Sequence, residues 1–245
     1  MKTTALVIAC FAPVLTASGA ELRFSGTAAP LKGDRAIYEE HHLVEGECSD
    51  GLFRPNAQTV TYVRGDGDDQ FAQKKLSYGD SLLRPNVNFR QPDFNEVMEI
   101  TNRDGKELRI QWQTPGDDTE TYTVEVTDSL VADAGFDHLV RQHWSAVTTG
   151  ESVEFEFLAP TRGKAYEFEL EPARDDRINA AFTFRIKPSG TILGFLVDPI
   201  LLGYNADGML TDYLGLTNIR KDRDANYTAH IRYTLETAPD CELTR

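Results

Sequence analysis

Apolar and polar residues alternate over most of this chain, and this alternation constrains its fold more than any other feature. Between residues 35 and 235 the alternation has a period of two and is interrupted by clusters of Gly, Asp, Asn and Pro. Successive side chains of a strand point to opposite faces of a sheet, so this period indicates strands with one apolar and one wet face. We predict strands at residues 36–44, 59–63, 70–78, 94–100, 107–112, 122–126, 153–157, 166–170, 181–186, 199–204, 209–214 and 227–235.

Two turn sequences predict hairpins within this pattern. Residues 102–105 are Asn-Arg-Asp-Gly and residues 205–208 are Asn-Ala-Asp-Gly, and each lies between two alternating runs. Asp and Gly tolerate the positive φ angles of tight hairpin turns. The runs on either side of each turn are therefore expected to pair as antiparallel neighbours.

Only two segments have a helical pattern. The first spans residues 136–147, between potential caps at Asp133 and Gly150, and its apolar residues fall on one stripe: Phe136, Leu139, Val140, Trp144 and Val147. The second spans residues 189–197 and must end near Asp198, because a proline disfavours helix in the residue before it.

These elements predict a mainly β fold, a large curved antiparallel sheet that forms a half-open β-barrel. One amphipathic helix is expected to pack on the concave face, and the second, short helix lies in a late connection. No Pro-rich or Ser-rich linker interrupts the pattern. We therefore predict a single β-rich domain over residues 21–245, with two β-rich halves that meet near the helix as the alternative.

The first twenty residues have the layout of an export signal. Lys2 precedes an apolar run over residues 5–15, and small residues end the segment. We predict a signal peptide over residues 1–20 and a periplasmic or secreted mature chain. A lipoprotein anchored through Cys10 is the alternative. The apolar run is short for a membrane span, and no later run approaches that length, so no transmembrane segment is expected in the mature chain.

The charge and the cysteines agree with export. The formal net charge is −14, which argues against binding to nucleic acid or to an anionic lipid surface. Once Cys10 is removed, Cys48 and Cys241 remain, and in an oxidising compartment they are expected to form a disulfide. In the chain-entropy model such a bridge stabilises the fold by about 4–5 kcal/mol. Two unpaired thiols are the alternative.

No residue pattern predicts catalysis, a metal site or a cofactor. The chain lacks a G-x-S-x-G elbow, an H-E-x-x-H pair and a CxxC pair. His41 and His42 are adjacent on a strand and point to opposite faces. His138 and His143 are too far apart around a helix to share a ligand. We interpret His143, beside Trp144, either as a hydrogen-bonded residue of the helix–sheet interface or as a ligand contact.

Two stretches resemble a known family. They are DAGFDHLVRQHW at residues 133–144 and LVDPILLGYNADGMLTDYLGLTNI at residues 196–219. They look like an uncharacterised family of exported proteobacterial proteins that has no assigned activity, and the resemblance implies no functional residue. The sheet-plus-helix plan is also similar to the incomplete β-barrels of periplasmic lipoprotein carriers, in which the gap between sheet and helix takes an acyl chain. Fold alone does not give function.

Three functions follow as hypotheses. The first is non-enzymatic binding of a lipid or other apolar ligand in the groove between sheet and helix. Its candidate residues are Phe136, Leu139, Val140, His143, Trp144, Ile192, Leu193, Phe195 and Leu196, unless they simply form the core. The second is a structural or interaction protein of the envelope, which predicts a filled interior and an open sheet edge or exposed apolar patch. The third is a hydrolase of envelope lipid or glycan, with His143 and a carboxylate in a cleft.

Overall fold

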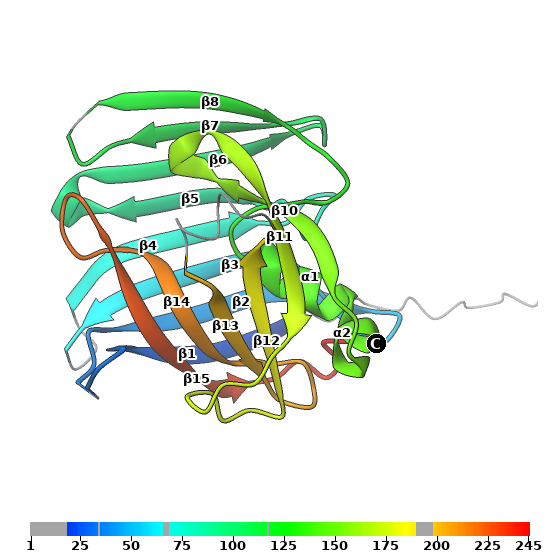
Figure 1. Ribbon diagram of the computed structural model, residues 1–245. Helices are drawn as coiled ribbons and strands as arrows, with labels where there is room; N and C mark the ends of the chain where they lie inside the picture. Colours follow the sequence, from blue (N-terminus) through cyan, green and yellow to red (C-terminus); the bar gives the residue numbers. More distant parts are fainter. Residues whose placement is uncertain (1–18, 34, 66–68, 117, 190–197) are drawn as a thin grey trace, which may run out of the picture.

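All the strands of the structure belong to one sheet. The computed structural model describes residues 19–33, 35–65, 69–116, 118–189 and 198–245. In these residues fifteen strands form a single curved sheet whose two outermost strands, β8 and β9, are not paired with each other (Figure 1). The predicted mainly β architecture with an open barrel is therefore confirmed. The boundary between signal and mature chain stays a prediction.

The first half of the chain builds one side of the sheet. Each strand pairs antiparallel with the next one in sequence, from the centre of the sheet to its rim. The strands are β1 (Gly19–Pro30), β2 (Tyr38–Ser49), β3 (Leu52–Arg64), β4 (Asp69–Ser77), β5 (Asn86–Gln91), β6 (Glu96–Arg103), β7 (Glu107–Gln113) and β8 (Thr119–Glu125). A 3-10 turn, η1 (Pro92–Phe94), connects β5 to β6.

The second half builds the other side and returns to the centre. Its strands are β9 (Leu130–Val131), β10 (Val153–Ala159), β11 (Lys164–Pro172), β12 (Phe182–Pro188), β13 (Ile200–Tyr204), β14 (Leu210–Arg220) and β15 (Asn226–Thr237), with a 3-10 turn, η2 (Pro160–Arg162). β15 pairs antiparallel with β1, so the strands that come first and last in the sequence are neighbours at the centre of the sheet. Only β9 and β10 are parallel among the pairs in the described residues.

Each of the twelve predicted strands overlaps an observed one, whereas β1, β5 and β9 were not predicted. β1 contains Gly26, which interrupts its alternation, and the structure explains this glycine. A Cβ at Gly26 would collide with the side chains of Tyr233 and Ile231, which cross over β1 on the concave face. β1 begins at Gly19, so cleavage after Ala20 would remove its first two residues.

Both predicted hairpins are confirmed. In the turn between β6 and β7, Asp104 and Gly105 have φ angles of 52° and 67°, and the Lys106 N–H donates to the Arg103 carbonyl at 2.9 Å. Two central residues with positive φ define a type I′ turn, whose twist matches that of the paired strands. In the second turn, the Asn205 side chain accepts hydrogen bonds from two backbone N–H groups, those of Asp207 and Met209.

The predicted helix over residues 136–147 is present as two shorter helices. They are α1 (Gly135–Gln142) and α2 (Trp144–Thr149), and they meet at His143, whose φ and ψ of −103° and 17° interrupt the helix. Gly150 ends α2 with a φ of 110°, in the capping role expected from the sequence. Of the second predicted helix, residues 190–197 lie outside the described residues.

The sheet curls until its two halves touch through side chains. A Cβ at Gly163, which follows η2, would overlap the Tyr122 ring on β8, so the β10–β11 turn lies directly on the first half. At the end of β14, Arg220 donates two hydrogen bonds to Glu96 of β6, at 2.7 and 2.9 Å. These contacts hold the halves together without a backbone ladder between β8 and β9.

Candidate functional site

The predicted apolar site lies where the helices meet the second half of the sheet. Leu139, Val140 and Trp144 are 4%, 0% and 9% exposed. They pack with Val147 into a cluster of strand residues: Phe155, Phe168, Leu170, Phe184, Ile186, Leu202 and Tyr204. Phe136 is partly buried against the same cluster. In the described part of the chain, Leu139, Val140 and Trp144 thus belong to the buried cluster and Phe136 lies at its margin; binding of a ligand by these four residues stays a prediction.

His143, by contrast, does not line this interface. His143 is exposed, and Ile192, Leu193, Phe195 and Leu196 lie outside the described residues. His138 occupies the buried position that we expected for His143: it is 7% exposed, and its ring contacts the Tyr78 ring edge-on at 5.0 Å. Helix registry explains the difference, because the break at His143 turns this residue away from the sheet. Burial lowers the pKa of His138 to about 4, so its imidazole is neutral at pH 7.

A chain of polar side chains lies inside the sheet. The alternation of β2 places Glu40 and His42 on the concave face and His41 on the convex face. His42 Nε2 lies 3.0 Å from Glu40, and the Gln58 amide lies 3.1 Å from His42 Nδ1. The Tyr78 hydroxyl donates to Gln58 at 2.8 Å, and the Tyr233 hydroxyl donates to Glu40 at 3.1 Å. We call these five residues the interior polar cluster.

The interior polar cluster satisfies its own hydrogen bonds. Because the Gln58 oxygen accepts from Tyr78, its amide nitrogen faces His42 Nδ1 and donates to it. His42 Nε2 then carries the proton and donates to Glu40. Neither ring nitrogen of His42 is left for acid–base chemistry, so the geometry gives this histidine a structural role. Among the described residues, no carboxylate bonds to His143, whereas the buried His230 lies 2.8 Å from Asp212 on the neighbouring strand.

A second polar contact fixes the helices to the first half of the sheet. Lys74 of β4 donates to Asp133, just before α1, at 2.7 Å, and both side chains are mostly buried. Burial by itself would lower the pKa of Lys74, but the charge and the hydrogen bond of Asp133, together with the charge of Glu40, outweigh it and raise this pKa. The ion pair therefore holds the start of α1 over β4.

Clusters of metal-ligating side chains and membrane-spanning helices are absent from the part of the chain that the structure describes. Within the described ranges, no group of three His, Cys, Asp or Glu side chains could hold a metal ion. None of the helices there has the length and apolar character needed to cross a bilayer. The structure thus adds no candidate ligand set to the sequence.

The rim strand β8 has a neighbouring strand on only one side. Thr114 N–H donates to Asp118 and Val126 N–H donates to Lys106, which fixes the phase of the β7–β8 ladder. In antiparallel pairs the hydrogen-bonded positions alternate. The backbone N–H and C=O groups of four residues consequently point away from β7: Thr119, Thr121, Thr123 and Glu125. No described residue forms a hydrogen bond with these groups, and β8 forms the rim of the sheet (Figure 1).

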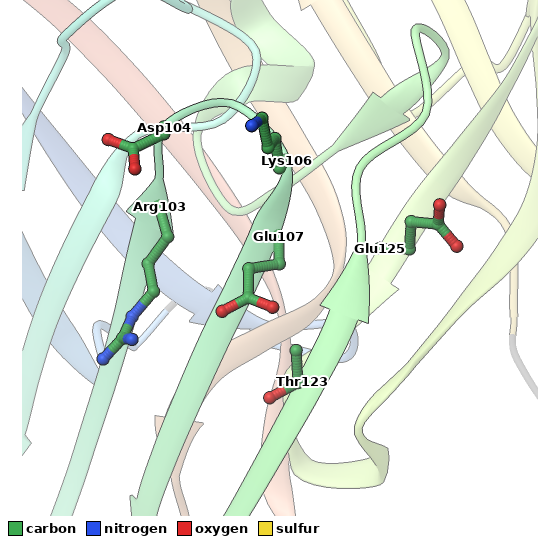
Figure 2. Close-up of a pocket in the computed structure, with 6 residues that line it drawn as sticks. All are labelled: Arg103, Asp104, Lys106, Glu107, Thr123 and Glu125. Atoms are coloured by element: carbon green, nitrogen blue, oxygen red, sulfur yellow. The ribbon is translucent and has the colours of Figure 1, made fainter.

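A shallow hollow of about 620 Å³ lies on the outer face beside the end of β8 (Figure 2). It is bounded by the β6–β7 turn and by β8, and its lining residues are Arg103, Asp104, Lys106, Glu107, Thr123 and Glu125. These charges are of both signs, and Figure 2 shows that the side chains do not converge on one point. The hollow therefore favours no class of small ligand.

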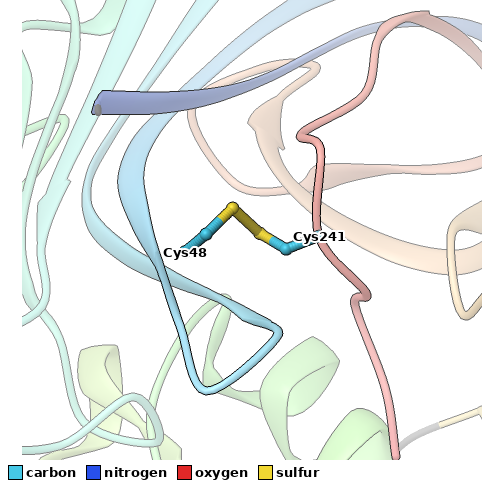
Figure 3. Close-up of a disulfide and its surroundings, with 2 residues drawn as sticks. All are labelled: Cys48 and Cys241. Carbon is cyan, nitrogen blue, oxygen red and sulfur yellow. A yellow bond between two sulfur atoms is a disulfide. The ribbon is translucent and has the colours of Figure 1, made fainter. Parts of the chain in front are cut away.

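A disulfide joins Cys48 to Cys241 and closes one end of the sheet (Figure 3). This confirms the pairing expected from the sequence. Beside it, Glu242 N–H donates to Gly51 and Phe53 N–H donates to Glu242, both at 2.9 Å. Leu243 covers an apolar cluster at the ends of the central strands: Leu22, Phe24, Val44, Phe53 and Met209. The bridge thus holds the C-terminal tail against the β2–β3 hairpin.

Comparison with known proteins gives one structural similarity. No family model and no curated protein matches this chain. A crystal structure described as a beta-barrel-like protein of a domain of unknown function, DUF1849, from Brucella abortus is similar with 10% sequence identity and a TM-score of 0.40. The match covers 90% of this chain and 96% of that chain. That protein is itself of unknown function.

Sequence reasoning did not identify the β8 rim as a site. The alternation predicted a strand at residues 122–126 but not its place in the sheet. One signal was present: residues 110–140 contain no Lys or Arg, although strand edges that face water commonly carry lysine.

Proposed function

We propose that this chain is a non-enzymatic, exported protein of the cell envelope that acts by binding another envelope protein. The observation that carries the proposal is the burial of the helix face against the sheet. The helix face expected to line a ligand groove packs against the sheet, and the interior polar cluster pairs its own groups. Binding is then left to the outer surface, where β8 has unpaired backbone groups.

The packing of the helices favours this function over lipid transport. A carrier needs an apolar space beside the helix, yet Leu139 and Val140 are 4% and 0% exposed and belong to one buried cluster with strand side chains. Filling that space with side chains gives a rigid core rather than a ligand chamber. Binding of a lipid stays the alternative, and it would require the helices to move away from the sheet.

Export is supported by the cysteines and by the predicted signal. A disulfide persists in a periplasm or a secreted space and is reduced in most cytosols. Cys48 is exposed, so a reducing compartment would have access to the bridge. We infer that residues 1–20 direct the chain to the periplasm or outside, with anchoring through Cys10 as the alternative.

The test combines localisation, lipid analysis and cross-linking in intact cells. The tagged full-length chain is expected in the periplasmic fraction with residue 21 at its N-terminus, and solvent extraction is expected to release no lipid. Formaldehyde treatment of the cells is expected to join it to a discrete envelope protein, identified by mass spectrometry after denaturing purification. Recovery of the chain as a monomer with a stoichiometric lipid would instead support the carrier and contradict the proposal.

A further inference from the structure

We propose that the Cys48–Cys241 bridge is a site of thiol–disulfide exchange on the folded protein, where a dithiol reductant frees the C-terminal strap. The C-terminal strap is the segment that follows β15, residues 238–245. The bridge links this strap covalently to β2 (Figure 3). Exchange at the bridge goes beyond the binding of an envelope protein and does not depend on it.

The C-terminal strap lies across one end of the sheet and contacts two turns. Glu242 N–H donates to the Gly51 carbonyl, and the Glu242 carbonyl accepts from Phe53 N–H, both at 2.9 Å. Further along, Thr244 packs on Gly208, where a Cβ would overlap its side chain. The strap thus joins the β2–β3 hairpin to the β13–β14 turn.

Apolar side chains lie beneath the C-terminal strap. Leu243 and Cys241 pack on a cluster whose members are at most 8% exposed: Leu22, Phe24, Val44, Phe53 and Met209. The Phe24 ring stacks on the His42 ring with centroids 4.2 Å apart, so this cluster reaches the interior polar cluster. Detachment of the strap would therefore open the apolar end of the concave face to water.

The bridge is placed where an external thiolate can reach it without unfolding of the sheet. Cys48 is exposed at the end of β2, whereas Cys241 is half-buried against the apolar cluster. The rate of exchange depends on access to the sulfur that is attacked. Attack is therefore expected at Cys48, which makes Cys241 of the strap the leaving thiolate.

The exchange consists of two displacements that balance. A thiolate of the dithiol attacks the Cys48 sulfur, the bond to Cys241 breaks, and Cys241 leaves as a thiolate that takes up a proton. The second thiol of the reductant, as its thiolate, then displaces Cys48 from the mixed disulfide. The dithiol ends as a disulfide, and two cysteine thiols remain on the protein.

In the reduced protein only non-covalent contacts hold the C-terminal strap. The contacts of Glu242, Leu243 and Thr244 keep the strap closed in most molecules, but the strap is then able to open while the sheet stays folded. Such local openings are detected by hydrogen exchange. Loss of the restraint on one backbone position is expected to raise the population of the open strap about tenfold.

The first experiment tests whether the folded protein is reduced. The exported chain is treated with dithiothreitol, and free thiols are counted by alkylation and mass spectrometry. Gly135→Ala is the matched variant, because its Cβ meets the Leu83 carbonyl at the start of α1 and destabilises the fold. We expect equal rates of reduction in the two proteins. A rate about thirtyfold higher in Gly135→Ala would mean that the bridge reacts only in unfolded chains, and would overturn the proposal.

A second measurement needs no variant and identifies the sulfur that is attacked. The wild-type protein is treated briefly with the monothiol 2-mercaptoethanol, the mixed disulfide is trapped with acid, and the adduct is located by peptide mapping. We expect the adduct on Cys48 and a free thiol on Cys241. An adduct mainly on Cys241 would contradict direct attack on the folded protein, in which this residue is half-buried.

Hydrogen exchange tests whether reduction frees the C-terminal strap. The backbone N–H groups of Glu242 and Phe53 are followed by NMR in oxidised and reduced wild-type protein. The control is the N–H of Lys106, which closes the β6–β7 turn by donating to Arg103. We expect exchange at Glu242 and Phe53 to become about tenfold faster on reduction, with no change at Lys106. Unchanged rates at all three positions, or an equal increase at all three, would refute the release of the strap.

Discussion

Removal of the disulfide is the sharpest test of how this sheet is stabilised. The bridge connects residues separated by 193 positions and so closes a loop of most of the described chain. In the chain-entropy model a loop of this length lowers the entropy of the unfolded ensemble enough to stabilise the native state by about 5 kcal/mol. The free energy of unfolding of a domain is typically about 5–15 kcal/mol, so this loss is large.

The native state itself is expected to change little. Without the bridge, the tail still has the two backbone hydrogen bonds of Glu242 and the packing of Leu243 over the end of the sheet. The cost of the Cys48→Ser/Cys241→Ser double variant therefore arises mainly from the greater freedom of its unfolded chain. Reduced wild-type protein is expected to lose the same amount, since it too lacks the link.

The assay is urea unfolding followed by tryptophan fluorescence. Trp112 lies on β7 in the first half and Trp144 on α2, which packs on the second half. Single-tryptophan versions, Trp144→Phe and Trp112→Phe, report each half separately. Both are expected to show the same fall in unfolding midpoint when the disulfide is absent.

Two results would refute the reasoning. A loss smaller than about 1 kcal/mol would mean that the unfolded chain gains little freedom from the loss of the bridge, contrary to the loop-entropy argument. A large loss seen in only one half of the sheet would mean that the halves unfold separately. The side-chain contacts between them would then be too weak to couple them.

Two further predictions concern buried positions. Burial lowers the pKa of His138 from 6.5 to about 4, so the unfolded chain binds a proton there more readily than the folded chain, and about 3 kcal/mol of the free energy of unfolding is lost as the pH falls from above 6.5 to 4. Urea titrations should show a smaller pH-dependent loss of stability in His138→Gln. The variant His41→Gln, at an exposed site, should keep the wild-type loss. Gly135→Ala places a Cβ against the backbone carbonyl of Leu83 and should cost about 2 kcal/mol in thermal unfolding. This expectation is contradicted if Gly116→Ala costs as much, because a Cβ at Gly116 meets only Thr114 Oγ1, at an ordinary contact distance of 3.6 Å.

Local elements were predictable because their signals are local. Asp104 and Gly105 tolerate positive φ wherever they occur, so the hairpin between β6 and β7 followed from two residues. The strands β5 and β1 were not predicted, because their local signals are weak. Gly26 weakens the alternation of β1, and its purpose is visible only when Tyr233, far along the chain, crosses over it.

The helix shows where local pattern stops being sufficient. Its apolar stripe correctly identified Leu139, Val140 and Trp144 as the face that meets the sheet. It could not show that the helix breaks at His143 and leaves this residue exposed, or that His138 is buried against Tyr78. Whether an apolar stripe lines a groove or fills a core depends on the distance to the opposite sheet, which no periodicity encodes.

The sequence by itself determined the class of the fold, the hairpins and the pairing of the two remaining cysteines. Alternation, turn residues and cysteine number are properties of short segments or of simple counts. Only the tertiary structure decided the order of the strands, and with it the meeting of β1 with β15, the burial of the helix face against the sheet and the place of β8 at the rim. Strand order results from contacts between residues far apart in sequence, so a strand pattern such as that of residues 119–125 is the same at the centre of a sheet and at its edge.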